Sequence, residues 1–335
     1  MAPQPGPRAP WKYPVTVGVA FRVLVNVASP SHESSTGEYT EHKKAPIYFN
    51  GRTYLDVPII SGNALRRYVK EALIVTAGKH GLPLGNLCRK GIFTHWNTGQ
   101  DVRDDVGVDK VAVNKVKELL RKCFMEDVAG FMYAEGGASI VRFSRLHAAT
   151  MRPTYKSLTQ AKAYPIQFAR HVPGKEGGRG GKSGQMIFRV EHVSGEFAGL
   201  ITLDAHLLGF DDYTQEYFVG KLPDDVVERA EAVLEAIYLA LMRLGAMRAR
   251  SMTVGDVTSL AISVAQGIFT PADPAREGYA ELTEREAKGY GNLTGWGVKV
   301  IKYPEGVASV ADAFREARDE LRNLLEDSLG GRGGR

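Results

Sequence analysis

The segment Val15–Ala28 reads VTVGVAFRVLVNVA, and it is the starting point for the fold that we expect. Its valines alternate with other side chains, which is typical of a strand. Further along, helices are predicted after Ser61-Gly62-Asn63 and over residues 223–244, with strands at 199–205 and 256–265. The order strand, helix, strands, helix, strand predicts an α+β fold with a split βαβ, or ferredoxin-like, core.

The rest of the chain divides into an arm, insertions and a tail. Residues 1–14 contain five prolines and predict a flexible arm, and residues 330–335 form a flexible Gly-Arg tail. Between them we expect a single domain over residues 15–329, with insertions at about residues 29–58, 81–131 and 164–193. A further helix is predicted near the end, over residues 310–329.

Each insertion carries its own local signal. Asn50-Gly51 predicts a tight hairpin turn in the first. In the second, residues 81–109 are turn-rich and predict a surface segment, followed by one amphipathic helix over residues 110–128. In the third, two strand-like stretches flank a glycine-rich loop, which predicts an extended basic hairpin.

The charge is distributed unevenly. The whole chain carries a formal net charge of +5, yet residues 136–190 contain ten Lys or Arg and one acid, Glu176. Aromatic residues such as Phe143 and Tyr164 are interleaved with these bases. Because Lys and Arg neutralise phosphates while rings stack on bases, this pattern predicts a nucleic-acid partner. Charge alone does not separate RNA from DNA.

The sequence does not support a disulfide framework, a metal site, a membrane span or a phosphate-binding loop. Cys88 and Cys123 are the only cysteines and form no C-x-x-C motif, so we expect an intracellular, cytoplasmic protein without a metal site. The apolar run over residues 15–28 is interrupted by Arg22, so it does not predict a membrane span. Gly181-Lys182-Ser183 lacks the first glycine and the helix of a phosphate-binding loop. We expect neither a cofactor nor a catalytic residue.

Ser61 is a good N-cap residue for the helix that follows it. The same geometry leaves the backbone N–H groups of Gly62, Asn63 and Ala64 beside Arg66 and Arg67. Such a helix start is either a plain cap or a site for a nucleic-acid phosphate, and the sequence does not decide between the two.

Seven short stretches occur in an order that is similar to one known family. They are FRVLVN (21–26), YTEHKKAP (39–46), VPIISGNAL (57–65), VAGFMY (128–133), RFSR (142–145), SGQMIF (183–188) and LGAMRARS (244–251). Together they resemble the backbone subunit of archaeal type I-A CRISPR interference (Cascade) complexes, of the DevR family in the RAMP superfamily. The resemblance covers roughly residues 17–265.

The resemblance implies an RRM-like core with insertion domains and a role in antiviral defence. Copies of such a subunit stack head-to-tail along a CRISPR RNA (crRNA) as a homo-oligomeric filament, alongside other Cascade subunits. Each copy grips the RNA backbone, and a protruding hairpin displaces a base at regular intervals. The spacer then pairs with target DNA. The resemblance implies a binding scaffold that is not an enzyme and involves no membrane.

Candidate RNA-binding residues follow by position from the resemblance and from the basic segment. They are His42, Lys43, Lys44, Ser61, Asn63, Arg66, Arg67, Arg142, Arg145, Arg152, Lys175, Arg179, Lys182, Arg248 and Arg250. The hairpin loop over residues 174–184 is the candidate for the protruding element. Residues 245–247 read Gly-Ala-Met where relatives are usually glycine-rich, so this loop departs from the family pattern.

Two alternatives remain open from the sequence. The first is an endoribonuclease of the same superfamily that processes precursor crRNA, with His42 or His147 as general base. The second is a scaffold whose basic face binds an acidic protein. A further hypothesis concerns residues 211–235, which contain eight acids and two bases. This region is a candidate to contact a basic surface on the next copy of a filament.

Overall fold

In the computed structural model, which describes residues 9–36, 38–109, 111–135, 138–172, 184–244 and 254–330, strand β1 (Val15–Ala28) runs through the middle of a nine-stranded sheet. It pairs antiparallel with β11 (Gly184–Asp204) on one side and with β14 (Val254–Gln266) on the other. Val19, for example, lies between Ile201 and Ile262. Every residue from Val15 to Phe21 is buried, which explains the nearly continuous apolar run.

The sheet extends beyond both neighbours of β1. Next to β14 lies β15 (Val298–Tyr303), and along the outer edge of β11 lie β8 (Leu146–Ala148), β9 (Arg152–Pro153) and β10 (Lys162–Val172). β3 (Tyr39–His42) joins β11 in parallel and carries β2 (His32–Thr36) at its other side. Long β11 therefore connects the central sheet with the first and third predicted insertions.

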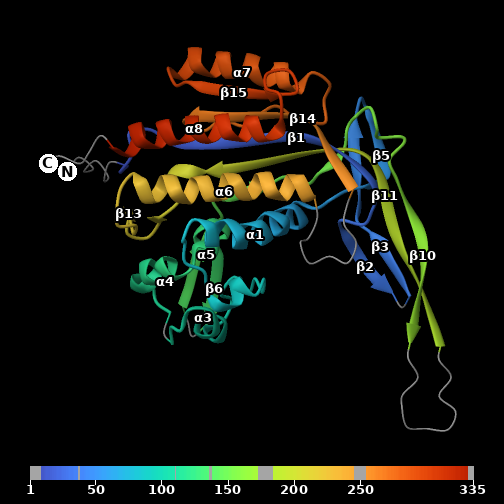
Figure 1. Cartoon of the computed structure of the whole chain (residues 1–335), viewed down its shortest axis with the longest axis horizontal. Coiled ribbons are helices and arrows are strands. Elements are labelled where there is room, and N and C mark those ends of the chain that lie inside the picture. Colours follow the sequence, from blue (N-terminus) through green and yellow to red (C-terminus); the bar gives the residue numbers. More distant parts are fainter. Residues whose placement is uncertain are drawn as a thin grey trace, which may run out of the picture.

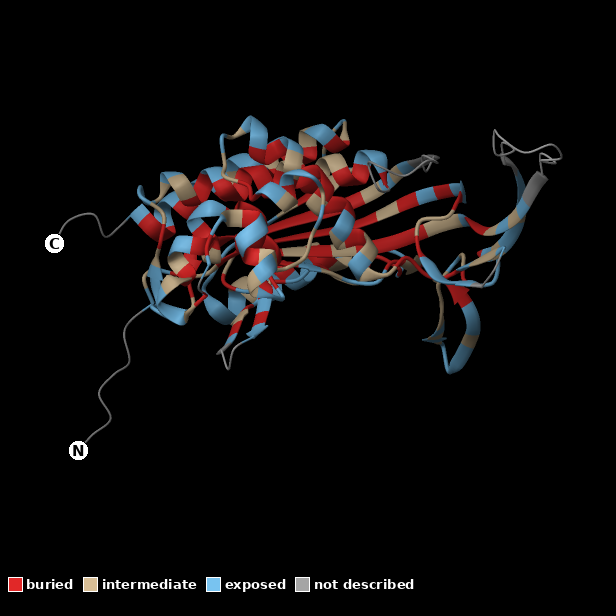
Figure 2. Cartoon of the chain, turned by 90° about the horizontal axis from the view of Figure 1, so that it is seen from below, coloured by how far each residue is buried: buried red, intermediate tan, exposed pale blue. Residues whose placement is uncertain are grey.

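Helices cover both faces of the central strands (Figure 1). α1 (Gly62–Lys79), α6 (Asp224–Arg243) and α8 (Val310–Gly330) share one large core with alternate residues of β1, such as Val17, Val19 and Phe21. On the other face, Ala20 packs against Tyr279 of α7 (Tyr279–Thr294). Figure 2 shows the buried residues concentrated where these helices meet the sheet. The predictions of α1, α6 and α8 are confirmed, whereas α7 and β15 were not predicted.

The first insertion forms strands, as its turn signal indicates. β4 (Lys44–Phe49) and β5 (Arg52–Pro58) pair through Asn50 and Gly51, whose φ angles are +49° and +74°. Both residues adopt the left-handed region that a two-residue hairpin turn of this class requires. The predicted hairpin is therefore confirmed.

The second insertion differs from its prediction. It consists of short helices and a two-stranded sheet: α2 (Asn86–Arg89), α3 (Gly99–Val106), η1 (Val113–Lys115), α4 (Val116–Lys122), α5 (Phe124–Ala129), β6 (Phe131–Glu135) and β7 (Ala138–Arg142). The single helix predicted over residues 110–128 is wrong, because the chain is extended at Cys123 (φ −141°, ψ 103°). The surface segment is also wrong, since Trp96 is fully buried in the main core. Apolar positions continue across the break, so periodicity does not reveal it.

The two ends of the described chain pack together. The Tyr13 side chain is buried, and its hydroxyl donates to Asp327 Oδ2 over 2.6 Å. The interpretation of residues 1–14 as a flexible arm is therefore wrong for residues 11–14, since Trp11 also packs against the core. Residues 331–335 lie outside the described residues. No helix among those described is long and apolar enough to cross a membrane.

β10 and the first half of β11 form a long antiparallel hairpin. Its register runs from Lys162 opposite Ser194 to Val172 opposite Gly184. Figure 1 shows this pair extending away from the helices and the central sheet. The strand pairing agrees with the prediction, while its glycine-rich loop, residues 173–183, lies outside the described part of the chain. The remaining short elements, η2 (Ala205–Leu207), β12 (Phe210–Asp211) and β13 (Glu216–Tyr217), follow β11.

Candidate nucleic-acid interface

The start of α1 is fixed by a cap and a close backbone contact. Ser61 is extended, and its Oγ accepts from the N–H of Ala64 over 3.2 Å. A Cβ on Gly62 would lie 2.3 Å from the carbonyl oxygen of Ala148, so only glycine allows the helix to begin against β8. Ser61 therefore acts as the N-cap of α1 through a hydrogen bond within the chain. Asn63, by contrast, is exposed.

One face of α1 lines a cleft of about 500 Å³, which we call the α1 cleft. Its lining residues are Asn63, Arg66, Lys70, His95, Asn97, Ala129, Gly130, Phe131, Met132, Val141, Arg142, Phe143 and Ser144. The opposite wall is the turn between α5 and β6 together with the end of β7. Phe143 and Met132 are 73% and 58% exposed there, so an open apolar rim faces basic side chains.

Two cations of α1 are positioned by groups of the opposite wall. Arg66 Nη2 donates to the carbonyl oxygen of Ala129 over 2.9 Å. Lys70 Nζ lies 2.9 Å from His95 Nε2, and His95 Nδ1 lies 3.1 Å from the carbonyl oxygen of Gly130. An ammonium donating to Nε2 leaves Nδ1–H to donate to Gly130, which is the neutral tautomer. Burial, followed by the charge of Arg66, lowers the pKa of Lys70 to about 8.

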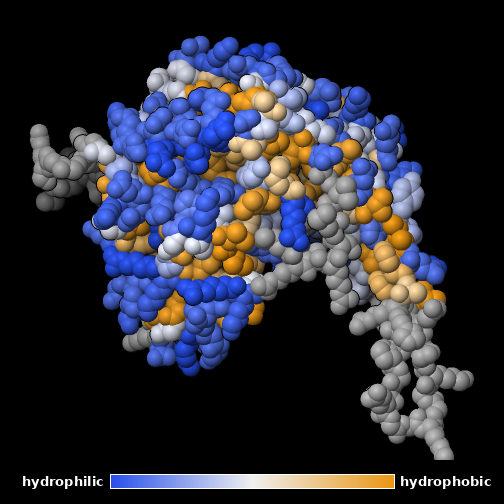
Figure 3. Space-filling model, in the orientation of Figure 1, coloured by the Kyte–Doolittle hydropathy of each residue, from blue (hydrophilic) through white to orange (hydrophobic). Residues whose placement is uncertain are grey.

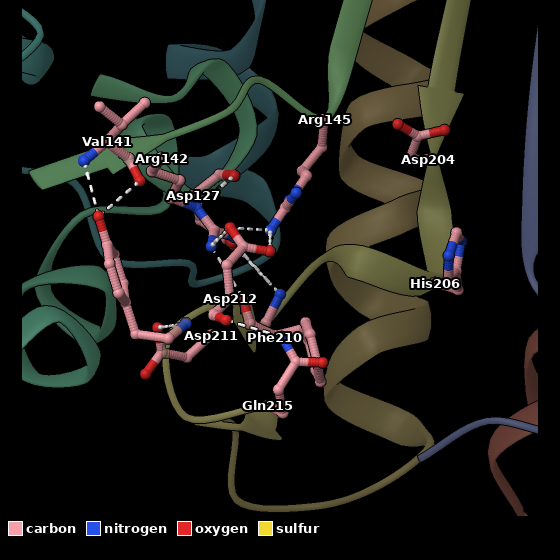
Figure 4. A network of polar contacts seen from close by, with 12 residues as sticks. Asp127, Val141, Arg142, Arg145, Asp204, His206, Phe210, Asp211, Asp212 and Gln215 are labelled. Atoms are coloured by element: carbon pink, nitrogen blue, oxygen red, sulfur yellow. Dashed lines mark hydrogen bonds and ion pairs between the residues drawn. The ribbon is translucent and has the colours of Figure 1, made fainter. Parts of the chain in front are cut away.

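Arg142 and Arg145, predicted to bind RNA, are structural instead (Figure 4). The Arg142 side chain is 1% exposed and contacts the carboxylate of fully buried Asp127, while its Nη1 donates to the carbonyl oxygen of Phe210 over 2.8 Å. Arg145 donates to both carboxylate oxygens of Asp212, over 2.6 and 2.7 Å. Their guanidinium groups are already bound by acids, so the prediction is corrected for both residues.

Arg67 and the residues of the first insertion lie away from the α1 cleft lining. Arg67 Nε forms an ion pair with Glu71 at 3.1 Å. Lys44 Nζ lies 3.0 Å from a carboxylate oxygen of Glu191, and Lys43 pairs with a glutamate of β2 at 3.4 Å. Burial alone would raise the pKa of Glu191, but hydrogen bonds from Tyr39, from a backbone N–H and from Lys44 together lower it. The predicted site residues therefore do not form one cluster.

His42 does not suit the general base of the nuclease alternative. Its residue exposure is 1%, Nδ1 bonds the carbonyl oxygen of Lys43 over 2.9 Å, and Nε2 has no partner among the described residues. Burial lowers the pKa of His42 to about 4. A neutral imidazole sealed from solvent cannot reach an RNA hydroxyl. His147 is accessible, and its Nε2 lies 3.2 Å from Asp204 Oδ2.

A second basic cleft lies between the β4–β5 hairpin and the start of β10. Its volume is about 530 Å³, and Lys44, Arg52 and Lys162 contribute to its lining. Arg152 precedes the residues of this cleft in the sequence, but its Nη2 forms an ion pair with Asp273 Oδ2 at 2.7 Å. Of the other candidates, Lys175, Arg179, Lys182, Arg248 and Arg250 lie outside the described residues.

The acidic region over residues 211–235 is largely neutralised within the chain. Asp212 pairs with Arg145, Glu216 with Lys117, Glu231 with Arg322 and Glu235 with Lys79. Asp211 and Asp225 accept hydrogen bonds from neighbouring groups of their own loops. Six of the eight acids are thus used internally, so net charge alone does not make this region a docking face.

Sequence reasoning missed Lys70 and His95. Asn63, Arg66 and Lys70 follow the i, i+3, i+7 spacing of one helix face, a signal that could have identified Lys70. His95 carried no comparable signal. It enters the cleft because the chain takes positive φ at His95 (+53°) and at Trp96 (+47°).

Comparison with known proteins identifies the family. A family model described as "CRISPR-associated negative auto-regulator DevR/Csa2" matches residues 19–284, from within β1 into α7. The chain belongs to the DevR/Csa2 family. The resemblance to DevR-family subunits drawn from the sequence is therefore confirmed, and the matched range includes every residue of the α1 cleft.

Two curated relatives of this DevR/Csa2 chain come from Saccharolobus solfataricus. "CRISPR-associated aCascade subunit Cas7/Csa2 2" is 28% identical over 287 residues, which cover 82% of this chain and 88% of the relative. "CRISPR-associated protein Cas7/Csa2 1" is 24% identical over 297 residues, which cover 86% and 91% of the two chains. Both similarities therefore extend over most of each protein.

Solved structures similar to this DevR/Csa2 chain include two named for RNA-guided complexes. A chain of a "CRISPR RNA-guided surveillance complex, pre-nicking" gives a TM-score of 0.49 at 10% identity, covering 91% of this chain and 100% of that chain. A chain of a "CRISPR RNA-guided surveillance complex" gives 0.47 at 10% identity, covering 91% and 98%.

Proposed function

We propose that this chain is a non-catalytic crRNA-binding backbone subunit of a type I, Cascade-like complex. Copies assemble head-to-tail along the crRNA with other Cascade subunits and present the spacer for pairing with target DNA. The observation that carries this proposal is the α1 cleft, where Arg66 and Lys70 face the exposed ring of Phe143 within the family-matched region. Cations suit the phosphates, and an exposed ring suits an unpaired base.

The topology supports an RRM-like core. The strands β14, β1 and β11 are neighbours in this order, with β8 and β9 on the outer edge of β11. α1 follows β1 after the strands of the first insertion, and α6 precedes β14. We propose that these elements form a split βαβ unit, with all three insertions placed between them.

The β10–β11 hairpin supports a contact outside the subunit. Phe168 and Phe188 stack with ring centroids 5.4 Å apart, and Phe168 and Ile187 are 37% and 41% exposed. Figure 3 shows hydrophobic surface gathered along these strands. Apolar side chains on an extended hairpin favour burial against the RNA or a neighbouring copy. We propose that the hairpin is the base-displacing element and that Lys175, Arg179 and Lys182 contact RNA from its loop.

Binding to the RNA backbone would allow one subunit to accept any spacer sequence. Contacts to phosphates position a protein on nucleic acid, whereas contacts to base edges give specificity. The α1 cleft offers Arg66, Lys70 and Asn63 together with a ring, and stacking is tolerant of sequence. We therefore expect unrelated crRNAs to bind with similar affinity.

The test compares RNA binding of a cleft variant with a matched control. The protein is purified natively, co-purifying RNA is sequenced, and binding of two crRNAs with unrelated spacers is measured over a salt series. Replacing Lys70 and Phe143 by alanine is expected to lower the affinity for both crRNAs roughly ten- to a hundredfold. The salt dependence of binding should also become less steep. Circular dichroism and the melting temperature check that the variant is folded, because Lys70 is partly buried and contacts His95.

The control variant replaces Lys288 and Leu293 of α7 by alanine. Both residues are exposed and lie far along the chain from the cleft. Its affinity should equal that of the wild type. Equal loss in both variants would remove the α1 cleft from the RNA interface, and failure of the wild type to bind crRNA even at low salt would overturn the function itself.

The pKa of Lys70 predicts a pH-dependent affinity. Since burial lowers this pKa to about 8, Lys70 is cationic at pH 7 and loses its proton as the pH rises to 9. Affinity for an RNA of adenine and cytosine only, whose bases do not titrate in this range, should fall over the interval. Lys70→Arg should abolish the dependence, because arginine stays charged. Unchanged pH dependence in Lys70→Arg would contradict the assignment.

The free energy of unfolding should rise with pH over the same interval in which the RNA affinity falls. The unfolded chain keeps the Lys70 proton up to the ordinary pKa of 10.5, whereas the folded chain releases it near 8. The unfolded state therefore binds more protons between these values, and this residue's contribution to the free energy of unfolding rises with pH. Affinity and stability are thus separable in the same pH series.

A further inference from the structure

A buried group of thiols and carboxylates lies in the second insertion, behind the α1 cleft. One ligand atom each from Cys88, Asp105 and Cys123 lies within 4.8 Å of the others, and all three residues are buried. Cys88 Sγ is 3.8 Å from Asp105 Oδ2 and also 3.8 Å from Glu126 Oε1. Glu126 is itself 1% exposed, so two sulfurs and two carboxylates meet away from water.

The Cys88 thiol has more acceptors than it can serve. Its single S–H lies near the carboxylates of Asp105 and Glu126, but one proton can serve only one of them. Buried anions need a paired charge, and burying them unpaired is costly. A bound divalent cation would satisfy all these acceptors at once.

The spacing of Cys88, Asp105 and Cys123 suits a small tetrahedral ion. Around zinc, with Zn–S near 2.3 Å and Zn–O near 2.0 Å, two sulfur ligands lie about 3.8 Å apart and a sulfur and an oxygen about 3.5 Å apart. One ligand atom from each of the three residues lies within 4.8 Å of the others, so small shifts bring them to these spacings. Glu126, whose Oε1 lies 3.8 Å from Cys88 Sγ, is the candidate for the fourth ligand.

Hydrogen bonds from neighbouring groups already orient the two carboxylates. Asp105 accepts from the N–H groups of Leu87 and Cys88 over 2.7 and 3.1 Å and from Trp96 Nε1 over 2.8 Å. Glu126 Oε2 lies 3.4 Å from His95 Nδ1. Outer partners of this kind fix metal ligands in place.

The short helices around this group need an additional contact that holds them together. The four groups come from α2, α3, the break between α4 and α5, and α5 itself, and these helices are only four to eight residues long. Helices this short are not stable by themselves. A central metal ion is one of the ways in which such small helical units are stabilised.

We propose that Cys88, Cys123, Asp105 and Glu126 bind one structural zinc ion. The ion joins α2, α3 and α5 and, through Glu126 and His95, supports the wall of the α1 cleft that holds Lys70. The site is independent of RNA, so it stands or falls separately from the proposed function.

The first test is the metal content of the full chain. Protein purified without chelator should contain about one zinc per chain, and Cys88→Ser and Cys123→Ser should each lose most of it. Asp104→Asn is the matched control, because Asp104 is the exposed neighbour of Asp105 on α3 and its carboxylate accepts a hydrogen bond from Gln100. This variant should keep its zinc and its melting temperature.

The second test shows which atoms bind. Exchange of zinc for Co²⁺ should give a thiolate-to-cobalt charge-transfer band in the near ultraviolet that Cys123→Ser reduces. A chelator should lower the melting temperature of the wild type and of Asp104→Asn but not that of Cys123→Ser. Native protein without metal and with two titratable thiols would overturn the proposal, as would a mass two hydrogens lower, which signifies a disulfide.

Discussion

Replacing Arg142 by alanine is expected to lower the free energy of unfolding by about 3–5 kcal/mol, the cost of leaving one partner of a buried ion pair uncompensated. Asp127 is fully buried and is held by Arg142, by Arg229 Nη1 over 2.7 Å and by the N–H of Gly209 over 3.0 Å. Loss of Arg142 also frees the carbonyl oxygen of Phe210. Urea unfolding followed by circular dichroism measures the effect.

Arg318→Ala is the control for this experiment. The Arg318 side chain is 49% exposed and pairs at 3.3 Å with Asp319, which is 64% exposed, so its loss should cost less than about 1 kcal/mol. The RNA-binding interpretation of Arg142 makes the opposite prediction. An Arg142→Ala variant as stable as the wild type but weak in RNA binding would restore that interpretation.

Replacing Gly130 by alanine should cost about 2–5 kcal/mol, because a left-handed backbone and a steric clash add together. The φ angle of Gly130 is +74°, and a Cβ there would lie 2.4 Å from the carbonyl oxygen of Arg142 and 2.7 Å from the N–H nitrogen of Ser144. Both contacts are to backbone, which cannot rotate away. The affected turn forms one wall of the α1 cleft, so crRNA affinity should fall with stability.

Gly51→Ala separates the two causes. Gly51 has the same φ of +74°, yet nothing lies within 4 Å of its Cβ position. Its loss of stability reports the cost of the backbone conformation alone, about 1–2 kcal/mol. The excess in Gly130→Ala then contains the clash together with the cost of the extended ψ of 166° at Gly130, which is essentially restricted to glycine. Equal losses in the two variants would mean that the turn relaxes, and the close packing at Gly130 would have no energetic consequence.

The main elements of the fold were predictable because each has a local cause. β1 alternates, α1 has its Ser61 cap, and α6 and α8 repeat apolar positions every three to four residues. α7 escaped prediction because its buried positions include small or polar residues such as Ala280 and Thr283, which give no apolar stripe. The break at Cys123 escaped because the apolar pattern continues through it.

The candidate site was only partly predictable. Asn63 and Arg66 do line the α1 cleft, whereas Arg142 and Arg145 look identical to binding residues in a basic stretch of sequence. Their partners, Asp127 and Asp212, lie 15 and 67 residues away along the chain. Local net charge does not indicate whether an arginine meets such a partner.

The sequence alone predicted the central strands β1, β11 and β14, the helices α1, α6 and α8, the concentration of positive charge and the family. Tertiary structure alone decided which charges remain available and which polar groups meet. Periodicity, caps and turns act over a few neighbouring residues, so one sequence reports them. Ion pairs, clefts and the Cys88–Cys123 group depend on contacts between distant segments, and these exist only once β11 and the helices have brought those segments together.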